Sequence, residues 1–427
     1  METQAFSVKE QPFSTRAENG NRDEEGRRHP RIVLYSHDTL GFGHLRRNLL
    51  LADALRRCSS KPEILLLAGM REAGAFEIPA GVDCLTLPAY SKGSDGQYQP
   101  RDLGKDLGEL TNLRASIIKA AIKNFEPELL VVDNVPRGAQ SELDSTLQYL
   151  RASNCGTRVV LGLRDVIDSP STVRKQWLRQ RNFEAIREFY DAVWVYGDPA
   201  VYSLIDDCEF GEDIRSKTVY TGFLDQSLRL NSQAARPSCD TVLGDDPRPY
   251  VLCAVGGGKD GSALCEAFSG ATLPAGHRAI LVTGSQMAKD KRQVIQTMVD
   301  ANADITMVDF VREPIALMQG AAGIVSMGGY NTVCEVLSLG RPALIVPRVA
   351  PRQEQWLRAN MLEARSLIDS LHPAQLSAEA LSQWMASLHG KPATVARSVI
   401  DMNGLGRVTE LADRFLSDLV APLSEAS

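Results

Sequence analysis

The chain lacks the patterns by which several common protein classes are identified. Its 427 residues include eight cysteines, but no Cys-x-x-Cys pair and no histidine at ligand spacing from a cysteine, so the usual zinc motifs are absent. No apolar run approaches the ~20 residues that a membrane-spanning helix needs. The GxxxxGK[ST] spacing of an ATP-binding loop is also missing. These absences disfavour structural zinc proteins, membrane-spanning proteins and P-loop ATPases.

The composition is that of a soluble globular protein. Hydrophobic residues make up 44% and charged residues 23% of the chain. The net charge of −6, with scattered lysines and arginines, argues against a nucleic-acid partner, which favours a concentrated basic face. Residues 1–30 hold five basic and six acidic residues and no apolar segment of a secretory signal, so we expect a disordered tail and reduced thiols in the cytoplasm.

Apolar strands alternate with amphipathic helices along most of the sequence. Helices are predicted at residues 45–57, 103–125, 171–189 and 405–416. Strands are predicted at 31–36, 63–68, 129–133, 158–163, 192–196, 250–255, 279–283, 305–308, 323–326 and 343–347. Such alternation indicates an α/β fold with parallel, doubly wound sheets.

A polar segment interrupts this alternation at residues 226–249 and is predicted to be an interdomain linker. We therefore expect a first Rossmann-like domain at 31–225, a second at 250–400 and a last helical segment at 401–427.

The most informative stretch is 326–360, SMGGYNTVCEVLSLGRPALIVPRVAPRQEQWLRAN. A glycine pair, Gly328 and Gly329, opens a predicted helix, and helix N-termini bind anions such as a diphosphate. Glu335 lies in the same helix, and a buried carboxylate there can accept hydrogen bonds from a ribose diol. The stretch is typical of a site for a nucleoside diphosphate.

Two further loops follow predicted strands. AVGGGKDG, residues 254–261, contains Gly257 and Gly258 before Lys259, and consecutive glycine N–H groups form an anion-binding nest. SHDTLGFGHLRRNLLLADAL, residues 36–55, places His44 at a helix start, where a neutral imidazole suits a general base. A lone histidine would more simply cap a helix.

Together these three motifs resemble GT-B glycosyltransferases of the family 28 type. That family includes the bacterial enzyme that adds N-acetylglucosamine to the lipid-linked peptidoglycan precursor. The resemblance implies two Rossmann-like domains facing across a cleft, with the nucleotide-sugar donor on the second domain and the acceptor on the first. The implied donor-binding residues are Gly257, Gly258, Lys259, Phe310, Val311, Gly328, Gly329, Asn331, Thr332, Glu335 and Gln355.

On the acceptor side the resemblance makes His44 the candidate catalytic base. Asp165, at the end of a predicted strand, is the second candidate catalytic residue, although it could equally pair with its neighbour Arg164. The remaining residues expected on the acceptor side of the cleft are His37, Gly41, Gly43, Arg47 and Arg164.

The predicted activity is inverting transfer of a sugar from a UDP-linked donor to an acceptor hydroxyl, in cell-surface glycan or glycolipid biosynthesis. No Asp-x-Asp motif occurs, so we expect no metal and no cofactor, with helix dipoles stabilising the departing diphosphate. The acceptor is expected to be a glycan or a lipid-linked molecule, with contact at the inner face of the membrane left open. The alternatives are a nucleotide-sugar hydrolase, an epimerase and a non-catalytic nucleotide-sugar-binding module.

Overall fold

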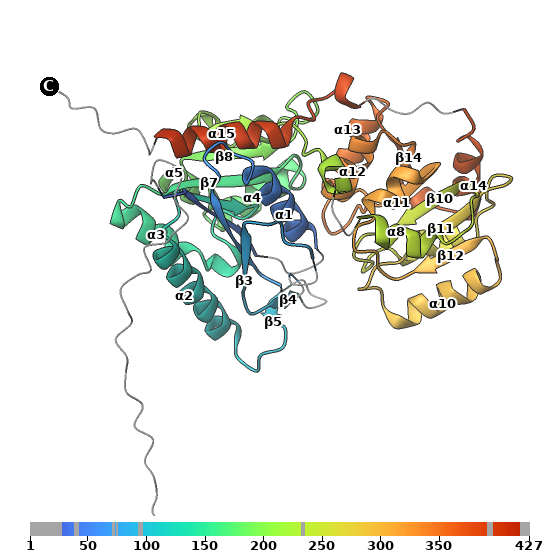
Figure 1. Cartoon of the computed structure of the whole chain (residues 1–427), viewed down its shortest axis with the longest axis horizontal. Helices are drawn as coiled ribbons and strands as arrows, with labels where there is room; N and C mark the ends of the chain where they lie inside the picture. Colours follow the sequence, from blue (N-terminus) through green and yellow to red (C-terminus); the bar gives the residue numbers. More distant parts are fainter. Residues whose placement is uncertain are drawn as a thin grey trace, which may run out of the picture.

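Two α/β domains lie side by side in this computed structural model (Figure 1). The structure describes residues 28–37, 42–70, 73, 76–92, 97–231, 235–390 and 396–418. Most of the tail expected at residues 1–30 lies outside the described residues, so its predicted disorder stays a prediction.

The first domain is built on a parallel sheet of seven strands in the order β3-β2-β1-β6-β7-β8-β9. Its strands are β1 (Arg31–Ser36), β2 (Glu63–Ala68), β3 (Val82–Thr86), β6 (Leu129–Asp133), β7 (Arg158–Arg164), β8 (Ala192–Tyr196) and β9 (Thr218–Tyr220), and a separate hairpin joins β4 (Tyr90–Lys92) to β5 (Tyr98–Pro100). Its helices are α1 (Gly43–Leu55), α2 (Leu107–Phe125), η2 (Ala139–Ser141), α3 (Asp144–Ser153), α4 (Pro170–Arg179), α5 (Asn182–Phe189), α6 (Leu204–Asp207) and α7 (Glu212–Arg215).

The second domain contains a parallel sheet of six strands in the order β12-β11-β10-β13-β14-β15. Its strands are β10 (Tyr250–Ala254), β11 (Arg278–Val282), β12 (Ile305–Val308), β13 (Gly323–Ser326), β14 (Ala343–Ile345) and β15 (Asp369–Ser370). The helices along this part of the chain are α8 (Ala235–Leu243), α9 (Ser262–Ser269), α10 (Lys289–Asp300), α11 (Ile315–Gly320), α12 (Tyr330–Leu339), α13 (Glu354–Glu363), η4 (Pro373–Gln375), α14 (Ala378–Ala386) and η5 (Ala396–Ser398).

Helices cover both faces of each sheet because successive strand residues point to opposite sides. In β1, Ile32 and Leu34 join a core cluster with α1, whereas Val33 and Tyr35 join another with α2 to α5. Alternate residues of β10 and β13 point to opposite faces in the same way. One set packs against α11 and α12, and the other packs against α9, α10 and α14. Strands buried on both faces explain the uninterrupted apolar runs in the sequence.

The segment predicted to be the interdomain linker, 226–249, contains two short helices. It forms η3 (Gln226–Asn231) and then α8, and both pack against helices of the second domain. The final helix, α15 (Gly404–Asp418), returns to the first domain and lies along α1, as Figure 1 shows in red above that domain. There Phe415 stacks on Trp194, with ring centroids 6.4 Å apart.

The sheet order fixes where a ligand can bind. In the first sheet, β1 pairs with β2 on one side and β6 on the other, and in the second, β10 lies between β11 and β13. The chain therefore reverses its winding direction at β1/β6 and at β10/β13, and in open α/β sheets ligands bind beyond the carboxyl ends of such strands. The motif loops at 37–44, 256–261 and 327–329 follow β1, β10 and β13.

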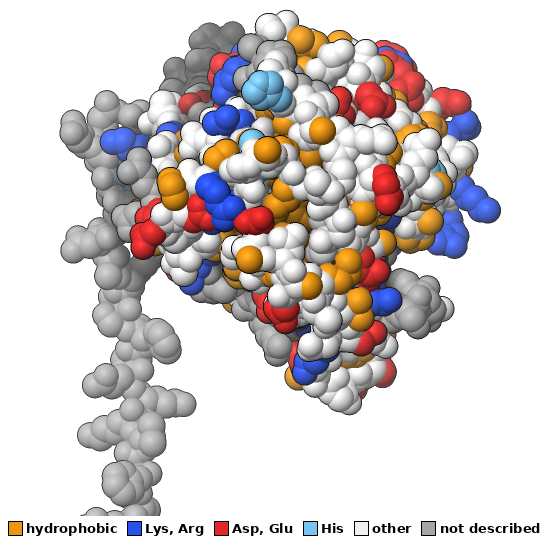
Figure 2. All heavy atoms as spheres, turned by 90° about the vertical axis from the view of Figure 1, so that its right-hand side faces the viewer, with side chains coloured by type: hydrophobic (Ala, Val, Ile, Leu, Met, Phe, Trp, Pro, Cys, Tyr) orange, Lys and Arg blue, Asp and Glu red, His pale blue; other side chains and the backbone are white. Residues whose placement is uncertain are grey.

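The described surface carries mixed charge. On the side of the molecule shown in Figure 2, acidic and basic side chains are interspersed with apolar ones. Among the described helices, none combines the length and hydropathy that crossing a membrane would require. All eight cysteines are free thiols, and six of them are buried.

Candidate active site

A cavity of about 350 Å³ lies between the two domains. Residues of both domains line it. From the first domain these are Phe42, Gly43, His44, Arg46, Arg47 and Arg164, and from the second they include residues 254–260, Val282, Gln286, 309–311, Ser326, 329–332, Glu335, Arg348 and Gln355. The three sequence motifs therefore meet at one place.

His44 stands at the first turn of α1, and its ring is held by a carboxylate. Its Nδ1 is hydrogen-bonded to Oδ2 of Asp133, the last residue of β6. Because a carboxylate accepts, Nδ1 carries the proton in this contact, and the lone pair of neutral His44 is then on Nε2. His44 lines the cavity with 19% of its side chain exposed. This is the arrangement of a histidine prepared to take a proton from a bound hydroxyl.

Arg47 fixes the charge of Asp133. Its Nη2 lies 2.6 Å from Oδ1 and 2.7 Å from Oδ2 of that carboxylate, and its Nε donates to Oδ1 at 2.9 Å. Burial alone would raise the pKa of Asp133, but Arg47 and His44 outweigh it and hold that pKa well below its usual range. Asp133 and Arg47 are each 2% exposed, so the ionised carboxylate is locked in place.

Of the other residues expected near His44, only some line the cavity. His37 is 5% exposed, is not among the cavity-lining residues, and packs on His44 with ring centroids 4.7 Å apart. Burial and then the charge of His44 lower the pKa of His37 well below its usual value, which keeps it neutral. Gly43 lines the cavity, whereas Gly41 lies outside the described residues.

The start of α12 forms the opposite wall. Gly329 is its N-cap, and no side chain caps the helix. The first N–H groups of a helix lack an intrahelical acceptor, so those of Tyr330, Asn331 and Thr332 are available to an anion in the cavity. Asn331 also bridges the domains, since its Nδ2 donates to the carbonyl of Gly43 at 2.8 Å.

The glycine-rich loop after β10 needs glycine for packing. Gly258 has φ +89°, and a Cβ there would lie 2.2 Å from the carbonyl oxygen of Thr283. The backbones of the 256–258 loop and Gly284 thus pack directly on each other. Gly257, Gly258 and Lys259 all line the cavity.

Glu335 and Gln355 complete the second-domain wall. Glu335 is 3% exposed and accepts a hydrogen bond on Oε1 from Arg229 at 2.5 Å. Gln355 accepts on Oε1 from the backbone N–H of Arg348 at 3.0 Å. Gly328, although expected at the donor, is not a cavity-lining residue, and its carbonyl accepts from Arg358 Nη1 at 3.0 Å.

Phe310 and Val311 lie where the second domain meets α1. Both line the cavity; Val311 is 5% exposed and Phe310 44% exposed. The ring of Phe310 contacts that of Phe42 across the cleft, with centroids 5.9 Å apart. The pair narrows the cavity from both domains.

Asp165 does not have the place expected of a catalytic residue. It is 2% exposed, does not line the cavity, and forms a buried ion pair with Arg358 of α13, 2.6 Å from Nη2 to Oδ1. The guanidinium engages both oxygens of this carboxylate, which leaves it poorly placed to accept a substrate proton. The structure therefore corrects this prediction, because Asp165 joins the domains.

Arg164 lines the cavity without a carboxylate partner among the described residues. Burial, followed by the charges of Arg47 and Arg358, lowers the pKa of Arg164 to about 10. A partly buried cation without a counter-ion is suited to an anionic group of a ligand. The alternative in which Arg164 pairs with Asp165 is not seen among the described residues, since Arg358 occupies that carboxylate.

Two residues that contact the site, Asp133 and Tyr330, are not among the candidate site residues. The sequence places Asp133 at a strand end that could face the cleft, and the pairing of that strand with β1 puts it at the ligand edge of the sheet. Tyr330 had no such signal; its hydroxyl donates to the Tyr196 carbonyl at 2.9 Å, and its ring contacts the guanidinium groups of Arg47 and Arg358. Among the described residues no group of three or more His, Cys, Asp or Glu side chains is placed to hold a metal ion.

Comparison with known proteins connects this geometry to a family. Residues 252–396 match the model of the glycosyltransferase family 28 C-terminal domain. The UDP-N-acetylglucosamine--N-acetylmuramyl-(pentapeptide) pyrophosphoryl-undecaprenol N-acetylglucosamine transferase of Brucella abortus (strain S19) is 26% identical over 213 residues, which are 49% of this chain and 55% of that protein. The chain thus spans about half the length of the curated relatives it matches.

Solved structures share the fold at lower identity. Spinosyn forosaminyltransferase SpnP has a TM-score of 0.61 at 16% identity, over 92% of this chain and 99% of that chain. UDP-GlcNAc 2-epimerase from Neisseria meningitidis, bound to UDP-GlcNAc, has a TM-score of 0.58 at 14% identity, over 91% and 99%. The predicted two-domain GT-B fold is confirmed by these structures, and the family resemblance is confirmed over residues 252–396, which match the glycosyltransferase family 28 C-terminal domain.

Proposed function

We propose that the protein is an inverting glycosyltransferase that moves a sugar from a nucleoside-diphosphate donor, UDP-linked, to a hydroxyl group of an acceptor. One observation carries the proposal. His44, whose ring is held by the buried Asp133, lines the same cavity as the open N-terminus of α12 and the buried carboxylate of Glu335. A proton acceptor and an anion site at opposite walls are what sugar transfer from a diphosphate requires.

The donor is assigned to the second domain. The N–H groups at the start of α12 and in the 256–258 loop would hold the diphosphate, and Glu335 would accept hydrogen bonds from the ribose. Phe310 and Val311 would lie against the base, and Gln355 would contact the donor sugar or ribose. The family 28 model covers this domain, and the curated relatives carry a UDP-sugar in their names.

The reaction would proceed by a single displacement at the anomeric carbon. His44 Nε2 takes the proton of the acceptor hydroxyl while that oxygen forms a bond to the anomeric carbon on the face opposite the diphosphate. The bond from the anomeric carbon to the diphosphate oxygen breaks, and its electron pair leaves with the nucleoside diphosphate. Asp133, held ionised by Arg47, stabilises the imidazolium that forms. The geometry of attack inverts the anomeric configuration.

The acceptor is assigned to the first domain, where His44, Gly43 and Arg164 line the cavity. We propose a glycan or lipid-linked acceptor used in cell-surface synthesis on the cytoplasmic side, because the Brucella relative is named for a pyrophosphoryl-undecaprenol substrate. Arg164, which has no carboxylate partner among the described residues, would suit an anionic group on either substrate. Neither a metal ion nor nucleic acid has a part in this proposal.

Incubation of the purified protein with a panel of UDP-sugars, with and without lipid-linked acceptors, tests the proposal. Release of UDP that depends on an acceptor, with an inverted anomeric proton in the product by NMR, is expected. Rapid stoichiometric release of free sugar without acceptor would instead identify a hydrolase, interconversion of epimers an epimerase, and binding without turnover a sensor. Glu335→Ala should weaken UDP binding about tenfold to a hundredfold, since a charged hydrogen-bond acceptor contributes about 1.5–3 kcal/mol.

A further inference from the structure

A buried arginine from the interdomain segment contacts the carboxylate assigned to the ribose. Arg229 lies in η3, and its Nη1 donates to Oε1 of Glu335 at 2.5 Å. On its other side, Nε donates to Glu313 Oε2 at 3.0 Å and Nη2 to Glu313 Oε1 at 3.1 Å. The side chains of the three residues are only 4–12% exposed, so one guanidinium is shared by two desolvated carboxylates.

Arg229 is itself anchored on α12, the helix that carries Glu335. Its Nη1 also donates to Gln226 Oε1 at 3.0 Å, and the backbone N–H of Gln226 donates to Ser338 Oγ at 2.8 Å. The Ser338 hydroxyl in turn bonds to the carbonyl of Cys334, one residue before Glu335. The arginine therefore reaches Glu335 from a segment that is fixed to the same helix.

We propose that Arg229 is a positioning residue for donor binding, which orients Glu335 toward the ribose; this role rests on the proposed function. Glu335 lines the cavity and Arg229 does not, so Arg229 acts through the carboxylate. Its bond engages Oε1, and in the described part of the chain no hydrogen bond to Oε2 is present, which leaves that oxygen for a ligand hydroxyl.

The second carboxylate explains why the arginine does not simply neutralise the first. Glu313 takes a two-pronged ion pair with Arg229, so the guanidinium is shared between two carboxylates and is not matched to Glu335 alone. Arg46 of α1 is the other cation near the pair, and its Nη2 is bound to the carbonyl of Arg312.

The test compares UDP binding and steady-state kinetics of Arg229→Met, Arg229→Lys and Glu313→Gln with wild type. Arg229→Met keeps the length of the side chain but frees Glu335, so we expect Kd for UDP and KM for the donor to rise about tenfold to a hundredfold, with kcat little changed. Arg229→Lys should recover part of the affinity, because an ammonium supplies the positive charge but lacks the paired N–H donors of a guanidinium. Glu313→Gln should have the smaller effect, since Arg229 can still reach Glu335.

The outcomes separate this role from the proposed function. UDP affinity retained in Arg229→Met, measured below its unfolding temperature, would overturn the positioning role alone and leave Arg229 as a stabilising residue. UDP binding that Glu335→Ala leaves intact would overturn the ribose assignment, and with it the role of Arg229. A wild-type protein that binds no nucleoside diphosphate would overturn both. Stability measured alongside shows whether the variants remain folded.

Discussion

The two walls of the interdomain cavity are built from different kinds of chemical group. The first domain contributes a connected set of side chains, Arg47, Asp133 and His44, whose charges balance when His44 is neutral. The second domain contributes backbone N–H groups at the start of α12 and in the 256–258 loop, beside side chains that include the carboxylates of Glu335, Asp260 and Asp309. Changes to the first wall should therefore alter the chemical step, and changes to the second should alter donor binding.

The largest effect is expected from breaking the side-chain wall. His44→Ala removes the proposed base, and Asp133→Asn removes the charge that orients its ring and partners Arg47. Loss of a positioned base typically lowers the rate about 10²–10⁴-fold, so kcat should fall by that order in both variants, while Kd for UDP changes little. Steady-state assays of UDP release measure the change in kcat, and calorimetry of UDP binding measures the change in Kd.

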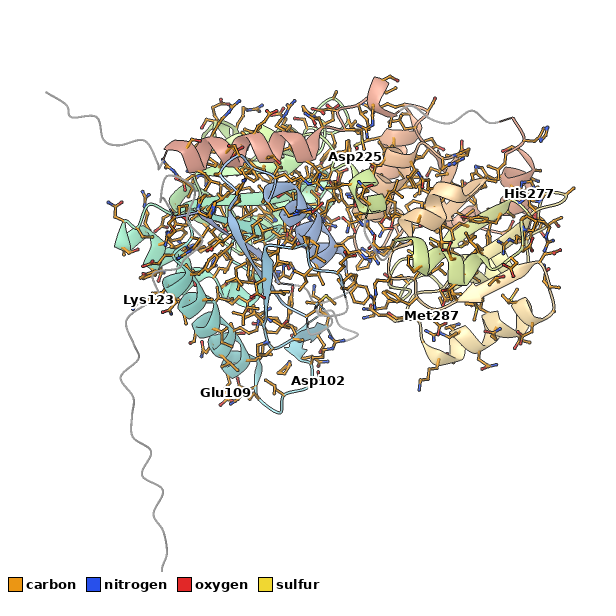
Figure 3. The ribbon with its side chains drawn as sticks, in the orientation of Figure 1. Asp102, Glu109, Lys123, Asp225, His277 and Met287 are labelled. Carbon is orange, nitrogen blue, oxygen red and sulfur yellow. The ribbon has the colours of Figure 1, made fainter. Side chains whose placement is uncertain are left out.

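His277→Ala is the matched control for His44, because His277 lies on the far side of the second domain, as Figure 3 shows. It should keep wild-type kcat and Kd. A His44→Ala variant with near-native kcat would leave His44 as a structural partner of Asp133, and an equal loss of UDP affinity would contradict the division between the walls.

The next largest effect is expected at the buried ion pair of Arg358 and Asp165, which joins the two domains. Arg358→Met leaves Asp165 as a buried carboxylate without its cation, and removing one partner of a buried pair typically costs about 3–5 kcal/mol. Denaturant unfolding should show a lower midpoint, and Arg358→Met with Asp165→Asn should recover part of the loss because the stranded charge is gone. Unchanged unfolding in the single variant would show that the pair does not hold the domains together.

The control for the Arg358–Asp165 pair is the exposed interdomain pair of Arg397 and Asp225. Asp225 lies at the junction of the domains in Figure 3, and Arg397 is 59% exposed. Exposed pairs contribute about 0–1 kcal/mol, so Arg397→Met should hardly move the midpoint. The contrast between the two arginines isolates burial as the cause.

The sequence predicts the central strands better than the edges, for a physical reason. Strands such as β1 and β10 are buried on both faces and so appear as uninterrupted apolar runs. The edge strands β3, β9 and β15 were missed because they are half-exposed or very short, and VDCLT has no clear pattern. The single helix expected at 171–189 divides into α4 and α5 at Arg181, which has a left-handed φ of +55°.

In the site, too, residues that a local sequence pattern defines are easier to predict than contacts between distant parts of the chain. Glu335, Gly329 and His44 could be selected because each is defined by its neighbours in sequence. Asp165 was misassigned because its partner Arg358 is 193 residues away, and the Arg229–Glu335 contact joins residues 106 apart. No local pattern encodes such pairs, whereas the strand order, once known, places Asp133 beside β1.

The backbone wall can be altered only by changing the path of the chain, and Gly258→Ala does so. A side chain there is strained at φ +89° and would collide with the Thr283 carbonyl, so the loop must move. Backbone strain of this kind costs about 1–3 kcal/mol, and we expect UDP affinity to fall about tenfold with kcat at saturation largely kept. Gly256→Ala is the matched control, because its φ is +65° but nothing lies within 4 Å of its added Cβ. Equal affinities for the two variants would mean that the loop does not hold the donor.

The smallest effect, none at all, is expected when divalent metal is removed. If N–H donors at the start of α12 and in the glycine loop stabilise the departing diphosphate, that stabilisation is fixed in the fold and independent of any ion. Turnover measured in excess EDTA should therefore equal turnover in Mg²⁺, at every donor concentration. Activity that disappears with EDTA and returns with Mg²⁺ or Mn²⁺ would show that the backbone wall is insufficient alone. In that event Kd for UDP with and without the ion would tell whether the metal acts in binding or in the departure of the diphosphate.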